Sequence, residues 1–243
     1  MKNYLTSVLK SLLFRDQYTY KPTSSTICAL VDFTYRIHTL LESNRYIRCV
    51  LIDFTKAFDM VDHVILARKL YCLQVPGFII QWIMSFLSDR TQATRLGFHL
   101  SMQLSINRSI VQGSGIGPIL FIMFIHDLKR LDIQNYLLKY ADTVSLLCPQ
   151  NSNTSTELKM GHVIDWAREN KISVNLLKMV ELVFRRPNIS NDLLPSVMTN
   201  VRMVGAAKLL GVHLTQNLTF SQHIDAVVTV CNQRLYLLAQ LKC

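Results

Sequence analysis

Apolar residues recur every three or four positions along several stretches of the chain, and this spacing predicts amphipathic helices. The clearest example covers 26–43, with Thr26 expected as its N-cap. Asp62 is expected to cap a helix over 61–73, because an Asp side chain accepts hydrogen bonds from the free N–H groups of a first helical turn. Further helices are expected at 1–14, 78–90, 119–131 directly after Pro118, 157–171 and, capped by Ser221, 220–242.

Apolar runs of a different kind predict the strands. The run at 47–54 is nearly continuous and ends in an acid, as expected for a strand that is buried on both faces. The stretch "LLKYADTVSLL" (137–147) has apolar residues on both sides of one acid, which predicts a hairpin whose turn falls at Ala141 and Asp142. Weaker strand patterns lie in 92–111, 172–187 and 208–214. Helices and strands mix without strict alternation, which predicts an α+β fold with a partly antiparallel sheet.

The composition narrows the class of protein. The chain has 243 residues, 50% of them hydrophobic, which is enough for a large domain with its own core. A formal net charge of +10 indicates an acidic partner such as nucleic acid, although a basic surface that only aids solubility stays open. The six cysteines form no CxxC or Cys/His cluster, which argues against structural zinc and fits an intracellular compartment, cytoplasmic or nuclear. No apolar run reaches the ~20 residues that a membrane span needs.

Asp53 and Asp142 stand out because each closes an apolar strand. If the two strands are neighbours in one sheet, both carboxylates meet at the same edge. Two bare carboxylates ~4 Å apart repel by roughly 4 kcal/mol at an effective dielectric of about 20, so such a pair either shares a proton or holds a cation. Hard divalent cations such as Mg²⁺ take oxygen ligands and keep open positions for phosphate. Taken singly, either residue is more simply explained as a turn or capping residue.

The context of these acids changes that interpretation. Six motifs follow one another along the chain: "DQYTYKPTSST" (16–26), "LIDFTKAFDMVDH" (51–63), "QGSGIGPILF" (112–121), "KYADTVSLL" (139–147), "NLLKMVELVF" (175–184) and "KLLGVHL" (208–214). The series resembles the reverse transcriptase domain of non-LTR (LINE-type) retrotransposons over nearly the whole chain.

The resemblance implies a right-hand polymerase palm with partial fingers and a short helical thumb. Fingers and palm would cover 1–214, and a partial thumb helix 215–243. The implied activity is that of an RNA-directed DNA polymerase. Its partners would be an RNA template, a DNA primer and deoxynucleoside triphosphates, with Mg²⁺, or Mn²⁺ in its place, as the cofactor.

The resemblance also implies roles for individual residues near the two acids. Asp53, the Phe54 carbonyl and Asp142 match the metal ligands of the family. Lys178 matches a lysine proposed to protonate the leaving pyrophosphate. Primer-grip residues are matched by Leu210 and Gly211. Arg185, Arg186, Arg202 and Lys208 would supply phosphate contacts, with a solvated basic face as the alternative.

Other positions match the family's substrate-binding residues. Lys21 would meet the triphosphate, and Phe58 would form the steric gate that excludes a ribose 2′-hydroxyl. Gln112 and Gly113 begin a Gly-rich turn that would lie against the nucleotide and the template. Without the resemblance, Phe58 is simply a core residue and the lysines are solvated surface groups. Asp59 and Asp62 are expected to be helix-start acids and not ligands.

Three departures from the family pattern bear on activity. Thr143 stands where the family's Tyr-Ala-Asp-Asp hairpin has its second Asp, and a change beside a metal commonly costs about 10–100-fold. The residues at 109–111, Ser-Ile-Val, replace a usual Gly-Val-Pro. The chain also starts just before the fingers segment and ends after a short thumb, as expected for a truncated copy. We therefore expect impaired polymerisation; a catalytically dead remnant that still binds nucleic acid is the alternative.

Overall fold

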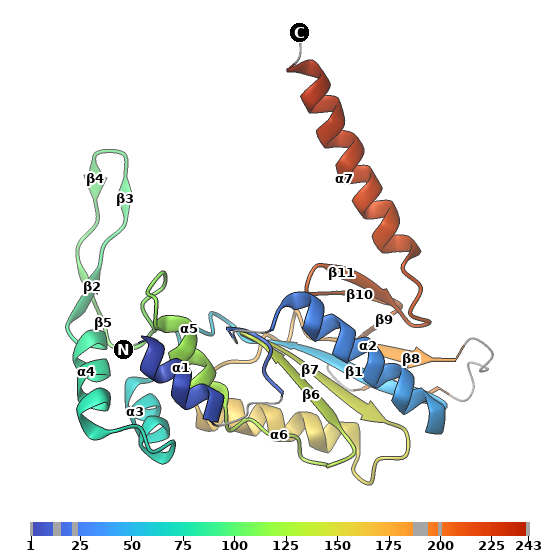
Figure 1. The fold of residues 1–243 in the computed structure, drawn as a ribbon, viewed down its shortest axis with the longest axis horizontal. Helices are drawn as coiled ribbons and strands as arrows, with labels where there is room; N and C mark the ends of the chain where they lie inside the picture. Colours follow the sequence, from blue (N-terminus) through green and yellow to red (C-terminus); the bar gives the residue numbers. More distant parts are fainter. Residues whose placement is uncertain (1, 12–15, 21–23, 187–193, 199–200, 242–243) are drawn as a thin grey trace.

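The computed structural model describes residues 2–11, 16–20, 24–186, 194–198 and 201–241, and a mixed sheet lies at its centre (Figure 1). The five strands of the sheet lie in the order β6 (Tyr136–Tyr140), β7 (Thr143–Pro149), β1 (Tyr46–Asp53), β8 (Val180–Arg185) and β9 (Arg202–Val204). Neighbouring strands are antiparallel except for β8 and β9, which are parallel. The α+β organisation with a partly antiparallel sheet is therefore confirmed.

Helices cover both faces of this sheet. One face packs against α2 (Thr26–Ser43), and the other against α5 (Gly117–Ile125) and α6 (Thr156–Glu169). β1 shows how the sequence produces this arrangement: Ile47 and Cys49 pack on the α2 side, whereas Val50 and Ile52 pack on the α5 side. A shift of one residue would exchange the two faces, so the apolar pattern fixes the register of β1 and the position of its last residue.

The remaining elements surround the sheet. They are α1 (Lys2–Ser11), α3 (His63–Cys72), α4 (Gly77–Leu87), β2 (Arg90–Gln92), β3 (Arg95–Leu96), β4 (His99–Leu100), β5 (Leu104–Ile106), β10 (Ala206–Leu209), β11 (Val212–Thr215) and α7 (Ser221–Gln240). The ribbon of β2 to β5 projects from the body, and α7 extends away from the β10–β11 hairpin (Figure 1). Among the helices of the described ranges, none combines the length and apolarity needed to cross a membrane.

The helix at 26–43 forms as predicted, but its N-cap lies one residue earlier. Ser25 accepts a hydrogen bond from the Cys28 N–H (3.2 Å), and Thr26 is already inside the helix. Asp62 caps α3 as predicted, because its carboxylate accepts from the N–H groups of two residues in the first turn. Adjacent Ser and Thr residues are similar as N-caps, so the sequence could not decide between neighbours.

Two other helix predictions need correction. Phe220 holds the N-cap position of α7 and makes no side-chain cap, so Ser221 begins the helix without capping it. α5 is shorter than the predicted 119–131: it ends at Ile125, and Pro118 lies within its first turn. Proline is accepted there, because the first N–H groups of a helix have no partner inside the helix.

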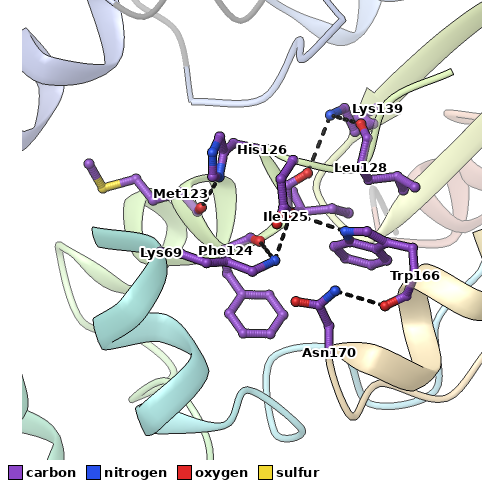
Figure 2. Close-up of polar contacts among 10 residues, drawn as sticks. Lys69, Met123, Phe124, Ile125, His126, Leu128, Lys139, Trp166 and Asn170 are labelled. Carbon is purple, nitrogen blue, oxygen red and sulfur yellow. Dashed lines mark hydrogen bonds and ion pairs between the residues drawn. The ribbon is translucent and has the colours of Figure 1, made fainter. Parts of the chain in front are cut away.

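The end of α5 is buried, and two lysines meet its terminal carbonyls (Figure 2). Lys69 Nζ donates to the Phe124 carbonyl (2.7 Å). Lys139 Nζ donates to the Ile125 carbonyl (3.3 Å) and also to the Leu128 carbonyl (2.9 Å), which lies beyond the end of the helix. Both side chains are almost fully buried. Burial lowers the pKa of both ammonium groups, that of Lys139 to about 8. The last carbonyls of a helix lack partners in the helix, so the two lysines supply the missing donors.

Candidate active site

The pairing of β1 with β7 brings the two acids to one edge of the sheet. Asp53, the last residue of β1, lies opposite Thr143, the first residue of β7. Asp142 directly precedes Thr143 in the two-residue turn between β6 and β7. Ala141, the other turn residue, has a φ of +53°, a left-handed conformation that costs a non-glycine residue about 1 kcal/mol. The strands are therefore neighbours, as the convergence of Asp53 and Asp142 requires.

Negative charge predominates at the positions of Asp53 and Asp142. Burial raises the pKa of the partly buried Asp142 carboxyl, and the negative charge of Asp53 raises it further. Lys178 opposes this effect: its Nζ lies 3.2 Å from Asp53 Oδ2, and the lysine side chain is 70% exposed. Among the described residues, Asp53 thus has a solvated ammonium group as its ion-pair partner, and Asp142 has no ion-pair partner within 4.0 Å. Negative charge that the fold leaves uncompensated is typical of a cation site.

The Phe54 carbonyl faces the same side of β1 as the hairpin. The Asp53 carbonyl accepts a hydrogen bond from the Asn175 N–H (2.8 Å), and the Thr55 N–H donates to the Ser173 carbonyl (2.8 Å). These bonds flank the bridge between Phe54 and Val174, so the Phe54 carbonyl points away from that bridge, towards β7. Asn175 could not be expected from the sequence, because nothing local indicates that its backbone holds the end of β1.

A groove opens beside Asp53, and its lining does not include Asp142. It has a volume of about 410 Å³, and its lining includes Asp53, Thr143, Lys178, Arg202, Lys208 and Leu210. Leu210 and Gly211 form the turn of the β10–β11 hairpin, with φ angles of +47° and +93°. Positive φ at both central residues is the pattern of a type I′ turn. The predicted strand or hairpin at 208–214 is therefore a hairpin, and Leu210 borders the same groove as Asp53.

The candidate substrate-binding residues form a second group. The Phe58 ring stacks on Phe121 with a centroid distance of 4.4 Å, and the Phe58 carbonyl accepts from the Ile110 N–H (2.9 Å). Gln112 Nε2 donates to Asp59 Oδ1 (2.8 Å). Asp59 was expected to be a helix-start acid; this was wrong, because it lies in a turn before α3 and holds Gln112. The Gly-rich turn is thus fastened to the segment that carries Phe58.

Glycine plays different parts within that turn. Gly113 has a φ of +80°, which favours glycine, and the space at its missing Cβ is open. Gly117 is crowded: a Cβ there would lie 2.8 Å from Ser114 Oγ and 3.0 Å from the Val111 carbonyl. Gly117 is therefore needed for packing inside the turn, whereas Gly113 is needed for its backbone conformation.

Lys21 lies outside the described residues. Among the other expected residues, Arg185 does not line the groove. Arg186 donates to the carbonyls of Leu41 (2.5 and 2.9 Å) and Glu42 (3.0 Å) at the end of α2, so the prediction of a phosphate contact there is replaced by a structural role. Gly211 lies in the hairpin turn but is not part of the groove lining.

The donor set at the edge of the sheet fits a divalent cation. Across the described ranges, no three His, Cys, Asp or Glu side chains gather as metal ligands. The edge offers two carboxylates and the Phe54 carbonyl, which are the hard oxygen donors that Mg²⁺ and Mn²⁺ prefer. The neutral Thr143 adds none of the charge that a third carboxylate would bring.

Comparison with solved structures shows the fold. Apo telomerase from Candida tropicalis matches 90% of this chain and 39% of its own, with a TM-score of 0.63 and 16% identity. Telomerase from Candida albicans in complex with a TWJ fragment of telomeric RNA matches 89% of this chain and 38% of its own, with a TM-score of 0.61 and 14% identity. With helices on both faces of the mixed sheet, this likeness confirms the predicted α+β polymerase palm.

Comparison of sequences shows the family. A probable RNA-directed DNA polymerase from transposon X-element of Drosophila melanogaster is 28% identical over 227 residues, 88% of this chain and 24% of the relative. The RNA-directed DNA polymerase from mobile element jockey of the same species is 28% identical over 201 residues, 77% of this chain and 22% of the relative. The chain spans about a quarter of the length of these relatives. The family model for reverse transcriptase (RNA-dependent DNA polymerase) matches residues 1–214. The chain therefore belongs to the reverse transcriptase family.

Proposed function

We propose that this chain is a polymerase domain that adds deoxynucleotides to a primer 3′ end on an RNA template. The observation that carries the proposal is the position of Asp53 and Asp142 at one edge of the sheet, beside a groove that reaches the β10–β11 hairpin. The names of the Drosophila relatives support RNA as the template and DNA as the product.

The acids and the groove would have different roles in the reaction. Asp53, Asp142 and the Phe54 carbonyl would hold divalent cations. When bound, Mg²⁺ ions activate the primer 3′-hydroxyl and stabilise the leaving pyrophosphate. Lys178, whose Nζ lies 3.2 Å from Asp53 Oδ2 and whose side chain is 70% exposed, would give the leaving pyrophosphate a proton. Leu210, across the groove, would hold the end of the primer together with Gly211.

Substrate selection would depend on the second group of residues. The Phe58 ring is held by its stack on Phe121, and a rigid ring can exclude the 2′-hydroxyl of a ribonucleotide. Gln112, fixed by Asp59, would contact the incoming nucleotide beside the Gly113 backbone. Lys21 stays a candidate for the triphosphate. Phe58→Val should therefore admit ribonucleotides while deoxynucleotides are still used.

The neutral Thr143 is the reason to expect slow primer extension. A polymerase with two carboxylates and one neutral hydroxyl at this edge binds its cations weakly, so we expect slow extension. The competing function is that of a catalytically dead domain that binds nucleic acid through its basic surface, and the same neutral Thr143 favours it.

A primer-extension assay on a poly-adenylate template, with Mg²⁺ and then Mn²⁺, tests the proposal. We expect weak extension by the parent chain, none by Asp53→Ala, and parental extension by Asp165→Ala, which removes an exposed carboxylate from α6. Extension that survives Asp53→Ala would show that the acids are not the site. Binding of the template without any extension in either metal would favour the dead domain.

A further inference from the structure

A second hollow lies at the opposite end of β6 from Asp142. It has a volume of about 460 Å³ and is lined chiefly by Asp16, Tyr18, Arg36, Lys129, Arg130 and Tyr136. Tyr136 begins β6, and Asp142 follows its last residue. At ~3.3 Å per strand residue, roughly 15–20 Å separates the hollow from the acids. None of its lining residues borders the groove at Asp53.

The negative charges at this hollow are already neutralised within the fold. Asp16 pairs with the buried Lys139 at 3.0 Å. Asp32, on α2 beside the hollow, pairs with Arg36 at 3.5 Å and accepts a hydrogen bond from the Tyr18 hydroxyl at 2.7 Å. The Tyr136 hydroxyl also donates to Asp32.

The hollow has more cationic side chains than carboxylates. Lys129 and Arg130 are exposed, and among the described residues no carboxylate lies within 4.0 Å of either side chain. After the pairs of Asp16 and Asp32 are counted, these two cations remain uncompensated. The hollow is therefore electropositive.

The arginines and tyrosines are held in place before any ligand arrives. The Arg36 guanidinium lies 5.1 Å from the centroid of the Tyr136 ring, and Arg130 donates to the Asn135 carbonyl at 3.0 Å. Burial raises the pKa of Tyr18 to about 12 and that of Tyr136 further, so both phenols stay neutral and add no repulsion towards an anion. Pre-positioned guanidinium groups match the oxygens of phosphate, to which they can donate two hydrogen bonds at once.

We propose that this hollow, the β6 pocket, is a second phosphate-binding site. Arg36, Lys129 and Arg130 bind the phosphate oxygens, and the two tyrosines form the neutral wall. The phosphates are either the backbone of a nucleic-acid strand that passes the far end of β6 or those of a free polyphosphate. The inference goes beyond the proposed polymerase activity and does not depend on it, because the pocket shares no residue with the acidic edge.

The test compares two double variants that remove the same charge. Lys129→Gln with Arg130→Gln changes the β6 pocket, and Arg45→Gln with Arg68→Gln removes two exposed arginines elsewhere. The single variant Lys129→Gln keeps the contact of Arg130 with the Asn135 carbonyl, so a loss of binding in this variant cannot come from the loss of that contact. The probes are a fluorescent 20-nucleotide single-stranded RNA, followed by anisotropy over a range of salt concentrations, and inorganic tripolyphosphate as a competitor.

We expect the pocket variant to bind RNA roughly 10–30-fold more weakly at about 0.1 M salt, with a salt slope lower by about 1.4, since each lost phosphate contact on a single strand is worth ~0.7. The control pair should show less than half of this loss. If tripolyphosphate leaves the difference in RNA affinity between the parent and the pocket variant unchanged, the ligand is the backbone of a strand. If tripolyphosphate binds the parent and not the pocket variant, the ligand is a free polyphosphate. Equal binding of both probes by the parent and the pocket variant would overturn the proposal.

Primer extension keeps this result separate from the polymerase proposal. A parent that does not extend primers but shows the pocket effect would refute only the polymerase. A parent that extends primers but shows no pocket effect would refute only the β6 pocket.

Discussion

The end of α5 and the edge of the sheet at Asp53 both remove charged side chains from water, but they treat the charges differently. At the end of α5, Lys69 contacts the Phe124 carbonyl and Asp127, and Lys139 contacts the Leu128 carbonyl and Asp16. At the edge of the sheet, Asp142 lies near a like charge, and the solvated Lys178 pairs with Asp53.

This difference in partners distinguishes charges that stabilise the fold from charges that are available to a ligand. Burial perturbs the pKa in both regions, so a shifted pKa alone does not mark a site. What distinguishes the edge is that a like charge, Asp53, raises the pKa of Asp142 further, whereas each buried lysine at the end of α5 is paired with a carboxylate. Removing a charge should therefore destabilise the protein at the end of α5 and stabilise it at the edge of the sheet, where it should also abolish activity.

The largest effect is expected for Asp142→Asn. Loss of a cation ligand removes several kcal/mol of transition-state stabilisation, so primer extension should fall by at least about 100-fold. The melting temperature should stay the same or rise, because the charged form of Asp142 is disfavoured in the fold. Extension rates and thermal melts of the parent and the variant check both parts. Retained extension would remove Asp142 from the site, and a large loss of stability would make it a structural residue.

Lys139→Met should show the opposite behaviour. The change breaks a buried ion pair and leaves the Leu128 carbonyl without its donor, so the free energy of unfolding should fall by about 2–4 kcal/mol. Urea unfolding measures this loss, and Lys208→Met, at an exposed lysine, should change the value by less than about 0.5 kcal/mol. Equal stability of the two variants would show that the buried lysine is not needed.

The contribution of Lys139 should also depend on pH. Its pKa is lowered from 10.5 to about 8 in the folded protein, so between these values the unfolded chain holds a proton that the folded chain has released. Stability from this group is therefore present above pH 10.5 and is lost as the pH falls to about 8. The advantage of the parent over Lys139→Met should rise by up to about 3 kcal/mol over that window. A constant difference in urea unfolding at pH 8 and pH 10.5 would contradict this account.

Thr143→Asp should restore the charge that the edge lacks. We expect extension to rise about 10–100-fold, the usual effect of changes beside a metal ligand. Thr143→Asn, which has a similar size and no charge, is the matched control and should stay near the parental rate. An equal gain in both variants would mean that shape and not charge limits the reaction.

The smallest effect is expected for Lys178→Gln. The ammonium competes with a cation for Asp53, and an exposed pair of this kind is worth about 0.2–1 kcal/mol, so Mn²⁺ should bind roughly 1.5–5-fold more tightly. Paramagnetic resonance of free Mn²⁺ measures the affinity, with Lys171→Gln as the control. Weaker binding in Lys178→Gln would contradict the competition.

The sequence predicted most of the sheet, because its strands follow from the apolar pattern. That Asp53 and Asp142 would meet was expected only if their strands were neighbours, and the pairing of β1 with β7 meets that condition. Two-sided burial identified β1, and the 137–147 pattern placed the turn at Ala141 and Asp142. The family resemblance supplied the roles that the pattern alone could not. The exact N-caps were missed at α2 and α7, since local preferences hardly distinguish adjacent residues.

Contacts between distant segments could not be predicted. The bond from Gln112 to Asp59 joins residues 53 positions apart, and no local pattern marks it. Lys69 and Lys139 resemble surface lysines in the sequence, and only the packing of α3 and β6 against the end of α5 buries them. The β6 pocket was missed for the same reason, because its residues come from separate parts of the chain.

Binding of Mn²⁺, followed by paramagnetic resonance, tests most directly whether the carboxylates of Asp53 and Asp142 form a cation site. We predict that the parent binds Mn²⁺, that the double variant Asp53→Asn with Asp142→Asn loses this binding, and that Asp165→Asn keeps it. Undiminished binding by the double variant would contradict the account.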